Sequence, residues 1–462
     1  MSLEERIRAG IEARKSELIG TLCRLLRQPS VSAQGLGVDE CAAVLRDIMA
    51  AHGIAARVMP TAGHPVVYGE YQVPGAHTIM LLYGHYDVQP PEPYEAWVSP
   101  PFEPTIRDGR IYARGAGDNK GQLITHVLAV KLLADLGLMP KVNLKFIFEG
   151  EEESLSPSLP AFLREHAELL RADVFYAADG PRHPSGRPVV FFGVRGVVGV
   201  ELVARGANRD LHSGEFGGPV PNPAWTLVEL LSTMRFPDGR VTIEGFYDRV
   251  VPPTAYEREL LARIPFDAEE VKRDLGITAF AGPPDLSWYE QLMFQPTLTI
   301  SGMASGYTGP GVKGVLPSEA VVRLEARLVA DQDPDDIFAK IARHVRRYAP
   351  EVEVRLLSRS APSKTSPELP VSRAIVAAIG DAFGVEPVVK PVLGASAPSY
   401  LFSQTLGLPV IWATYANYDE HNHAPNENIT IDSFLTGIYA SALVFARVAA
   451  LDPAELRVPA TG

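Results

Sequence analysis

The chain has 462 residues, of which 46% are hydrophobic and 21% charged, and its formal net charge is −12. A chain of this length exceeds what one hydrophobic core usually supports, so we expect a soluble protein of two domains. The acidic balance, with no Lys/Arg-rich run to offset it, argues against nucleic acid and anionic membranes as partners. No stretch approaches the ~18 uninterrupted apolar residues of a membrane span.

Cys23 and Cys41 are the only cysteines in the sequence. Two cysteines cannot form a disulfide framework in a chain of this size, and such low usage is typical of a reducing compartment. The N-terminus is charged from its first residues, and no apolar segment like that of a secretory signal follows. We therefore expect a cytoplasmic protein.

Apolar residues at helical spacing predict a helix over 3–27, which Gln28-Pro29-Ser30 should end. Beyond it, short apolar segments alternate with helical patterns. The predicted strands are 77–83, 142–148 and 174–178, and the predicted helix is 122–136. This alternation favours an α/β fold with a mostly parallel sheet and helices on both of its faces.

A second pattern begins near Arg195 and follows the order strand, helix, strand, strand, helix, strand. The strands are 196–205, 297–301, 321–330 and 351–357, and the helices are 223–235 and 335–348. This order predicts a split β-α-β sandwich, with the Pro-rich stretch 236–295 as an insertion. The first pattern then resumes with helix 372–383, strand 409–414 and helix 432–449. We expect one domain over 1–194 and 366–462, interrupted by an inserted α+β domain over 195–365.

Polar clusters follow the predicted strands where each one ends. Gly84-His85-Tyr86-Asp87 follows the first strand, the glutamate-rich run 149–153 the second, and Asp179 the third. His421-Asn422-His423 comes shortly after strand 409–414, and a glycine-rich loop at 115–121 opens a helix. Because ligands bind outside the carboxyl ends of the strands in open α/β sheets, we expect these clusters to converge on one crevice.

Several carboxylates cannot share a crevice at neutral pH unless cations neutralise them. Two divalent ions about 3.5–4 Å apart need a bridging carboxylate, terminal His and carboxylate ligands, and an open position for water. His, Asp and Glu without Cys suit Zn²⁺, Mn²⁺ or Co²⁺, and the sequence does not choose among them. Any one cluster alone could be a surface loop or a helix cap, but five together favour a metal site.

Short motifs also run through nearly the whole chain in a fixed order. They are Tyr83 to Pro90, Trp97, Pro101 to Pro104, Asp108-Gly109, Tyr112 to Gly115, Asp210 to Gly214, Arg327 to Val329 and His423 to Glu427. In this order they resemble the motifs of the M20 metallopeptidases, particularly the carnosine-dipeptidase-like branch. The resemblance implies a hydrolase that cuts an amide bond beside a free carboxylate in a small, dipeptide-like substrate, with 1–194 and 366–462 as the catalytic domain.

The resemblance also assigns metal ligands. His85 and Asp179 match the ligands of one ion, Glu153 and His423 those of the other, and Asp118 the carboxylate that bridges both. Each of these residues could instead have a purely structural role; Asp179, for example, could be a helix N-cap. The resemblance thus implies two divalent ions per chain.

Glu152 matches the general base of the family, and Asp87 would orient the imidazole of His85 from its far side. Adjacent residues on an extended segment point in opposite directions, so Glu153 can bind metal while Glu152 faces the water. The other register, with Glu151 as base and Glu152 as ligand, stays open.

In the inserted domain, His212 matches a histidine that stabilises the oxyanion in a neighbouring subunit's site. Arg327 matches the arginine that binds the substrate carboxylate, and Gly394 and Ser396 lie in a substrate-contact loop. The resemblance thus implies a homodimer formed through the inserted domain, which would also act as a lid. The plainer interpretations are a structural histidine and an exposed arginine on a sheet face.

Several positions depart from the family pattern. Asn119 replaces the second Asp of Asp-Asp-Lys-Gly, Leu155 stands where glycine is common, and Val392-Leu393 and Gly314 change two regions expected to contact substrate. These departures leave the substrate open. An N-acyl-amino-acid deacylase or desuccinylase would use the same metal chemistry. A catalytically inactive binding protein would keep the fold but lose Glu152 or a ligand, and all of these positions are filled.

Overall fold

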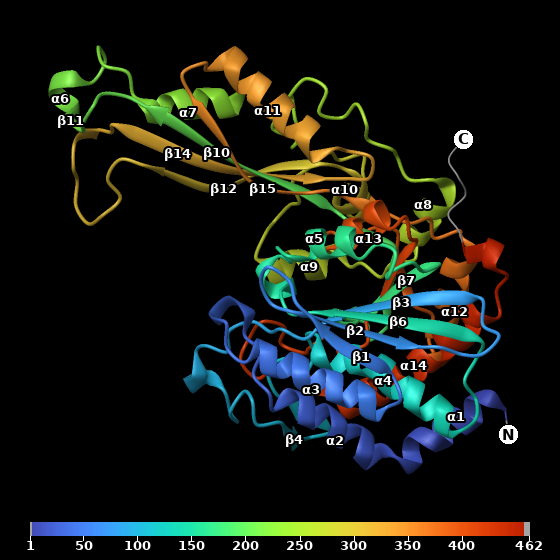
Figure 1. Cartoon of the computed structure of the whole chain (residues 1–462). Coiled ribbons are helices and arrows are strands. Elements are labelled where there is room, and N and C mark those ends of the chain that lie inside the picture. The colour runs from blue at the N-terminus through green and yellow to red at the C-terminus, as the bar shows by residue number, and fades with distance from the viewer. Residues whose placement is uncertain (1, 457–462) are drawn as a thin grey trace. The chain divides into compact units, whose positions relative to one another are not determined.

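The structure, a computed structural model, describes residues 2–456 (Figure 1). The chain divides into two compact units. The first comprises the residues up to Phe192, Thr365–Pro391 and the residues from Leu401 onward, and the second comprises Gly193–Lys364 and Val392–Tyr400. The boundaries expected at 194/195 and 366 lie within two residues of these breaks, and the segment Val392–Tyr400 joins the second unit in addition.

An eight-stranded sheet forms the centre of the first unit, in the order β1-β2-β6-β3-β7-β18-β8-β17. Its strands are β1 (Ala55–Met59), β2 (Val66–Tyr71), β3 (Thr78–His85), β6 (Val142–Glu149), β7 (Val174–Ala178), β8 (Val189–Phe191), β17 (Val388–Lys390) and β18 (Val410–Ala413). The central strands β6, β3, β7 and β18 run parallel to one another, whereas β1, β2 and β8 join by antiparallel pairing. The prediction of a mostly parallel α/β sheet is confirmed.

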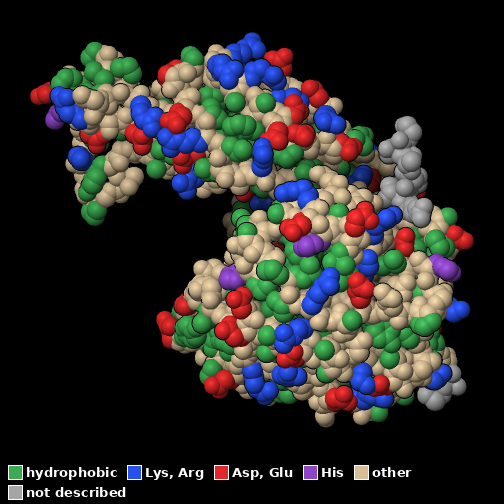
Figure 2. Space-filling model, viewed as in Figure 1, with side chains coloured by type: hydrophobic (Ala, Val, Ile, Leu, Met, Phe, Trp, Pro, Cys, Tyr) green, Lys and Arg blue, Asp and Glu red, His purple; other side chains and the backbone are tan. Residues whose placement is uncertain are grey.

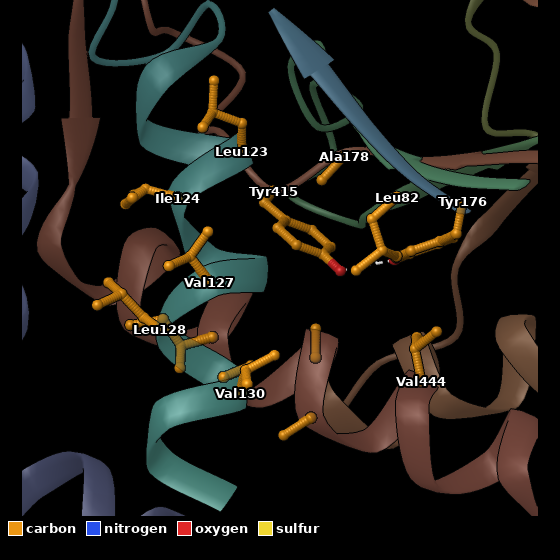
Figure 3. Close-up of a cluster of buried hydrophobic side chains, with 14 of the residues drawn as sticks. Leu82, Leu123, Ile124, Val127, Leu128, Val130, Tyr176, Ala178, Tyr415 and Val444 are labelled. Carbon is orange, nitrogen blue, oxygen red and sulfur yellow. Dashed lines mark hydrogen bonds between the residues drawn. The ribbon is translucent and has the colours of Figure 1, made fainter. Parts of the chain in front are cut away.

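Helices pack on both faces of this sheet. One face is covered by α1 (Leu3–Ala13), α2 (Lys15–Leu26), α3 (Val38–Ala51), α4 (Lys120–Asp135), α12 (Pro370–Phe383) and α14 (Ile431–Ala449). On this side Leu82 and Tyr176 lie among the side chains of α4 and α14 (Figure 3). Their strand neighbours Tyr83 and Phe175 point the other way, and both rings contact Phe402 of α13 (Ser399–Thr405), at centroid distances of 5.2 and 4.4 Å.

The helix expected over 3–27 is two helices, α1 and α2, separated at Arg14. Both helices bury their apolar faces in the same core, with Ile7 and Ile11 on α1 and Leu18 and Leu22 on α2. The apolar periodicity therefore continues across the break, and the pattern alone does not reveal it.

Helix α14 is unusually long and apolar. Among the described residues it is the one helix whose length (19 residues) and mean hydropathy (1.3) would suffice to cross a membrane. Since 67% of this segment is buried inside the protein, where it packs against α4 and α12, its apolar character is that of a core helix.

A four-stranded antiparallel sheet forms the second unit, in the order β12-β14-β10-β15. Its elements follow the chain as β10 (Gly196–Arg205), α7 (Pro223–Ser232), β12 (Thr297–Ser305), β14 (Glu319–Leu328), α11 (Pro334–Tyr348) and β15 (Glu353–Ser360). This is the split β-α-β arrangement that the sequence predicts. Leu227 of α7 and Ile341 of α11 pack with Val200 and Leu324 on one face of the sheet.

The other face of this sheet carries charged side chains in alternation. Glu201 accepts hydrogen bonds from Arg323 and Arg355, and Arg355 and Arg205 both donate to Glu353. Figure 2 shows blue and red side chains interspersed over these strands. Glu319 also pairs with Arg205, at 3.4 Å, so each of these three arginines lies beside a carboxylate.

The stretch 236–295 holds three helices that the sequence analysis left out: α8 (Ala255–Ala262), α9 (Ala268–Leu275) and α10 (Trp288–Phe294). Capping boxes begin α8 and α10, and Asp267 caps α9, so the cap residues were the available signal. The remaining elements are α5 (Leu159–Glu165), α6 (Ser213–Phe216), the pairs β9 (Gly193–Val194) with β16 (Ser363–Lys364) and β11 (Leu211–His212) with β13 (Val315–Leu316), and the small sheet β4 (Thr105–Arg107), β5 (Arg110–Tyr112) and β19 (Asn428–Thr430).

Candidate active site

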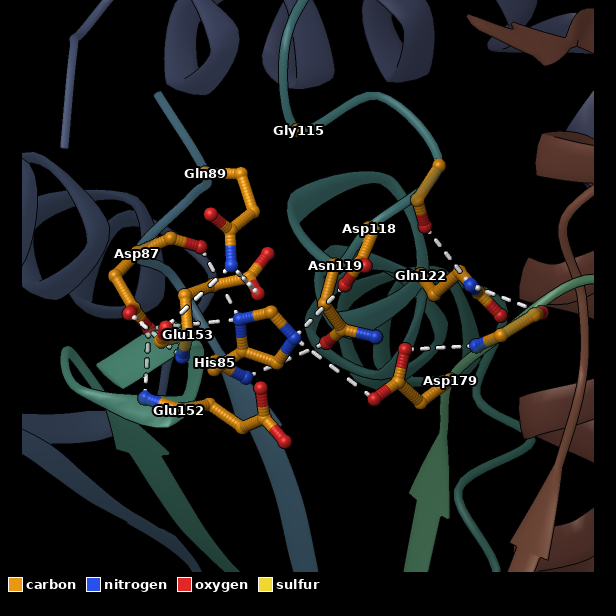
Figure 4. Close-up of polar contacts among 12 residues, drawn as sticks. His85, Asp87, Gln89, Gly115, Asp118, Asn119, Gln122, Glu152, Glu153 and Asp179 are labelled. Carbon is orange, nitrogen blue, oxygen red and sulfur yellow. Dashed lines mark hydrogen bonds and ion pairs between the residues drawn. The ribbon is translucent and has the colours of Figure 1, made fainter. Parts of the chain in front are cut away.

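Seven of the expected site residues gather at the carboxyl ends of the central strands in the first unit, and all of them except His423 are labelled in Figure 4. His85 ends β3, Asp179 follows β7, and Glu152 begins a short 3₁₀ turn three residues after β6. Asp118 lies just before α4, and His423 lies in the connection between β18 and β19. The remaining two, Asp87 and Glu153, are neighbours of these in the chain. The sheet topology thus brings five separate loops together.

Two groups of potential metal ligands share Asp118. In the first group, His85 Nε2 lies 2.9 Å from Asp118 Oδ1 and 3.8 Å from Asp179 Oδ2. In the second, His423 Nε2 lies 3.0 Å from Asp118 Oδ2 and 3.4 Å from Glu153 Oε2. The ligand atoms within each group are all within 4.8 Å of one another. Asp118 presents one oxygen to each group, which is the arrangement of a carboxylate that bridges two cations.

In the part of the chain that the structure describes, the carboxylates of this site form ion pairs with His85 and His423 but with no Lys or Arg side chain. Burial, followed by the nearby charge of Asp118, raises the pKa of Asp179 to about 6 and that of Glu153 to about 7. Burial above all raises the pKa of Glu152 well above its usual range. Crowded, buried acids of this kind ionise together only when cations offset their charge. The donor set therefore fits divalent metal ions.

Asp87 connects the first ligand group to the glutamate turn. Nδ1 of His85 lies 3.1 Å from the backbone oxygen of Asp87 and 3.5 Å from its carboxylate, so a proton on Nδ1 leaves Nε2 free for a metal ion. The two carboxylate oxygens of Asp87 also accept the backbone N–H groups of Glu152 and Glu153, at 3.2 and 3.1 Å. One buried side chain thus orients a histidine and holds two glutamates.

The three consecutive glutamates have different surroundings. The carboxylate of Glu151 accepts the backbone N–H groups of His64 and Ser158, at 2.9 and 3.1 Å. The side chain of Glu152 instead extends toward the gap between His85 and Asp179 (Figure 4). This geometry favours Glu152 over Glu151 as the residue that faces the metal ligands.

Glu427 shapes the glycine-rich loop, a role that the sequence analysis did not assign. Its buried carboxylate accepts the N–H groups of Gly115, Gly117 and Asp118, at 2.9 to 3.1 Å, and Arg114 Nη1 at 2.6 Å. The loop therefore folds around one carboxylate, which fixes the backbone of the shared ligand. The signal in the sequence was its place at the end of the motif His423 to Glu427.

Asn119 accounts for one departure from the family pattern. Its side-chain amide donates to the backbone oxygen of Ala178 at 2.7 Å, next to Asp179. A deprotonated aspartate cannot donate this hydrogen bond. Gln89, which the analysis also missed, donates to Glu153 Oε2 at 2.9 Å.

The other expected site residues belong to the second unit. Arg327 donates from Nε to Glu325 at 2.7 Å and from Nη1 to Ser396 Oγ at 3.0 Å, and Ser396 Oγ donates to the backbone oxygen of Arg195. Arg327 and Ser396 are therefore in direct contact. Gly394 abuts the side chain of Leu292. His212 is exposed at the end of β11, where its Nδ1 accepts the N–H of Gly214 at 3.1 Å.

Two histidine–carboxylate groups that share an aspartate define the class of a metal-dependent hydrolase. The sequence matches the model of peptidase family M20/M25/M40 over residues 81–447. The chain therefore belongs to this family and is a metallopeptidase of the M20 type.

Individual proteins resemble the chain over most of its length. It is 29% identical over 398 residues to the Cys-Gly metallodipeptidase dug1 of Schizosaccharomyces pombe, covering 84% of each chain. It is 28% identical over 397 residues to the Beta-Ala-His dipeptidase of Homo sapiens, covering 84% of this chain and 78% of that protein. The crystal structure of an M20 family metallo-carboxypeptidase from Sulfolobus solfataricus is 36% identical, with a TM-score of 0.85 and coverage of 94% of this chain and 100% of that one.

Proposed function

We propose that the protein hydrolyses the amide bond of a small, dipeptide-like substrate with a free carboxylate, using two divalent metal ions and Glu152 as general base. The observation that carries this proposal is the position of Asp118, which offers one oxygen to each ligand group. His85 and Asp179 would hold one ion, and Glu153 and His423 the other. Zn²⁺ or Mn²⁺ suits these ligands best, and Co²⁺ would also fit.

Bound in these groups, divalent ions would supply a water that loses its proton near neutral pH and would polarise the scissile carbonyl. Glu152 then accepts the proton and later delivers it to the leaving amine. Its buried carboxylate, with a raised pKa, suits both directions of transfer. Asp87 fixes the orientation of the imidazole of His85 relative to the glutamate turn. The chain's own residues thus provide the base and its alignment.

Arg327 of the second unit and the names of similar proteins both support a substrate with a free carboxylate. Arg327 offers a guanidinium fork for a carboxylate, and its contact with Ser396 supports a joint role for β14 and the loop of Gly394. Two similar proteins are named for Cys-Gly and Beta-Ala-His dipeptides and another as a carboxypeptidase. We infer a dipeptide whose C-terminal carboxylate binds Arg327.

We also infer that the protein acts as a homodimer through the inserted domain, which serves as a lid, and that His212 stabilises the oxyanion in the partner's site. Supporting this, His212 is exposed at the end of β11, which packs against α6. The inserted domain also exposes apolar side chains on α6 and α7, namely Phe216 (36% exposed), Trp225 (63%) and Val228 (42%).

A substrate panel tests the proposal. Purified protein with added Mn²⁺, Zn²⁺ or Co²⁺ is assayed on dipeptides, on the same dipeptides with an amidated C-terminus, and on N-acetyl and N-succinyl amino acids. We expect hydrolysis of free dipeptides and at least ~10²-fold lower kcat/KM for the amides, because Arg327 then loses its anionic partner. Preference for N-acyl amino acids would contradict the dipeptidase proposal and favour a deacylase.

A further inference from the structure

The turn that carries Glu152 contains two residues in an unfavourable backbone conformation. Leu155 has φ 69° and Ser156 has φ 49°, both in the left-handed region that favours glycine. The side chain of Leu155 is 89% exposed, so packing does not hold it there. Such conformations persist only where surrounding contacts determine them, and the contacts must come from elsewhere in the turn.

Glu151 supplies contacts on both sides of this turn. Its backbone oxygen accepts the N–H groups of Ser154 and Ser156, at 3.0 and 2.8 Å. Its carboxylate accepts the N–H of Ser158 beyond the turn and that of His64 in the loop between β1 and β2. The side chain is buried, with 6% exposed. Glu151 therefore closes the turn and ties it to a loop 87 residues away.

The loop between β1 and β2 fits closely around this carboxylate. A Cβ atom at Gly63 would lie 1.8 Å from Glu151 Oε1, and the next residue that it would meet is Ser158, whose Oγ would lie 3.0 Å away. Gly63 is exposed and outside the left-handed region, so a side chain there would act chiefly by displacing the carboxylate of Glu151.

We propose that Glu151 is a positioning residue, whose carboxylate holds the strained turn so that Glu152 keeps its alignment. This inference rests on the proposed function, in which Glu152 is the base. It assigns separate tasks to three consecutive glutamates: Glu151 anchors the turn, Glu152 exchanges the proton and Glu153 binds metal.

The test uses two independent perturbations of the anchor in the full-length, metal-loaded protein. Glu151→Gln replaces one accepting oxygen by an NH₂ group that cannot accept, and Gly63→Ala displaces the same carboxylate from outside. Each should lower kcat about 10-fold, as small misplacements of catalytic groups do, with KM within about 2-fold of wild type and metal content unchanged. Gly20→Ala, where a Cβ meets nothing within 4 Å, is the control.

A rescue experiment separates anchoring from general loss of structure. Glycine adopts the left-handed region without strain, so Leu155→Gly should leave the turn in place with less need for its anchor. Added to Glu151→Gln, it should restore kcat at least about 3-fold, whereas Leu155→Gly alone should show wild-type kcat.

Wild-type kcat in both Glu151→Gln and Gly63→Ala would overturn the inference, as would a loss of metal from Glu151→Gln. Glu152→Gln is assayed in parallel. If it keeps full kcat while Glu151→Gln is inactive, Glu151 is itself the base, and both the proposed function of Glu152 and the anchoring role fail. If Glu152→Gln is inactive and both anchor variants behave as wild type, the proposed function stands and only the anchoring role is lost.

Discussion

At the scale of single residues, the proposed mechanism requires that Glu152 act as the base and Glu153 as a metal ligand. Glu152→Gln keeps the size of the side chain but cannot accept a proton, so we expect kcat to fall at least ~10²-fold with metal content unchanged. Glu153→Gln is the matched control, because it removes a ligand oxygen rather than the base and should lower metal content instead. If Glu151→Gln lowers kcat and Glu152→Gln instead loses metal, Glu151 is the base, Glu152 is the ligand, and the assignment is shifted by one residue.

The buried His126 should make the folding stability of the protein depend on pH. Burial lowers the pKa of this histidine to about 3, and its Nδ1 lies 2.9 Å from Ser441 Oγ within the core. The folded-state pKa lies below the unfolded value of 6.5, so the neutral ring contributes stability above pH 6.5 that is lost as the pH falls toward 3.

Between pH 6.5 and 5 this loss amounts to roughly 2 kcal/mol, at 1.36 kcal/mol per pH unit. The leucine in His126→Leu cannot take up a proton. Between pH 6.5 and 5, the free energy of unfolding of this variant should therefore fall by roughly 2 kcal/mol less than that of the wild type. Denaturant unfolding of the metal-free proteins at both pH values measures the difference. Parallel pH dependence in the two proteins would show that His126 does not stay neutral in the fold.

At the level of secondary-structure elements, the turn after β6 ends at Leu155, whose backbone is left-handed. The side chain is almost fully exposed and the backbone is left-handed, so Leu155→Gly should remove strain at little cost in buried surface. We expect the free energy of unfolding to rise by about 0.5–1 kcal/mol. Leu275→Gly in α9, an exposed leucine in the last turn of a helix, should instead lower it. A destabilised Leu155→Gly would mean that the turn is not strained.

The sequence predicted the elements that carry the site better than the elements that frame it. β7 is buried throughout, and β3 and β6 are apolar and buried toward their carboxyl ends, so the ends of these strands and the residues after them could be placed in advance. β1 is partly exposed at the sheet edge, and β8 and β17 have three residues each, too short for a period to show. The boundary between α1 and α2, at Arg14, could not be predicted because the apolar pattern continues across it.

Residues that act through long-range contacts could not be predicted. Glu151, Glu152 and Glu153 are equivalent in sequence, and His64 and Ser158 distinguish them only in the fold. Glu427 was visible as the end of a motif, but its role depends on three backbone N–H groups more than 300 residues earlier in the chain. The motifs therefore indicated the candidate ligands, and the tertiary structure shows which residues hold them in place.

At the scale of the whole molecule, we predict that two chains share each active site. His212→Ala and Glu152→Gln should each be inactive alone. If they are unfolded and refolded together, the mixed dimer contains one site with an intact base from one chain and an intact histidine from the other. Recovered activity in the mixture would support sharing. Proven mixed dimers without activity would show that His212 serves its own chain or has a structural role.

The central claim is that Asp118 joins two metal ions in one site. Metal analysis of the purified, active protein, together with Asp118→Asn, His85→Ala and His423→Ala, tests it most directly. We predict two ions per wild-type chain, loss of about one ion in each histidine variant, and loss of both ions and of activity in Asp118→Asn. Full activity with no more than one tightly bound ion per chain would contradict the claim.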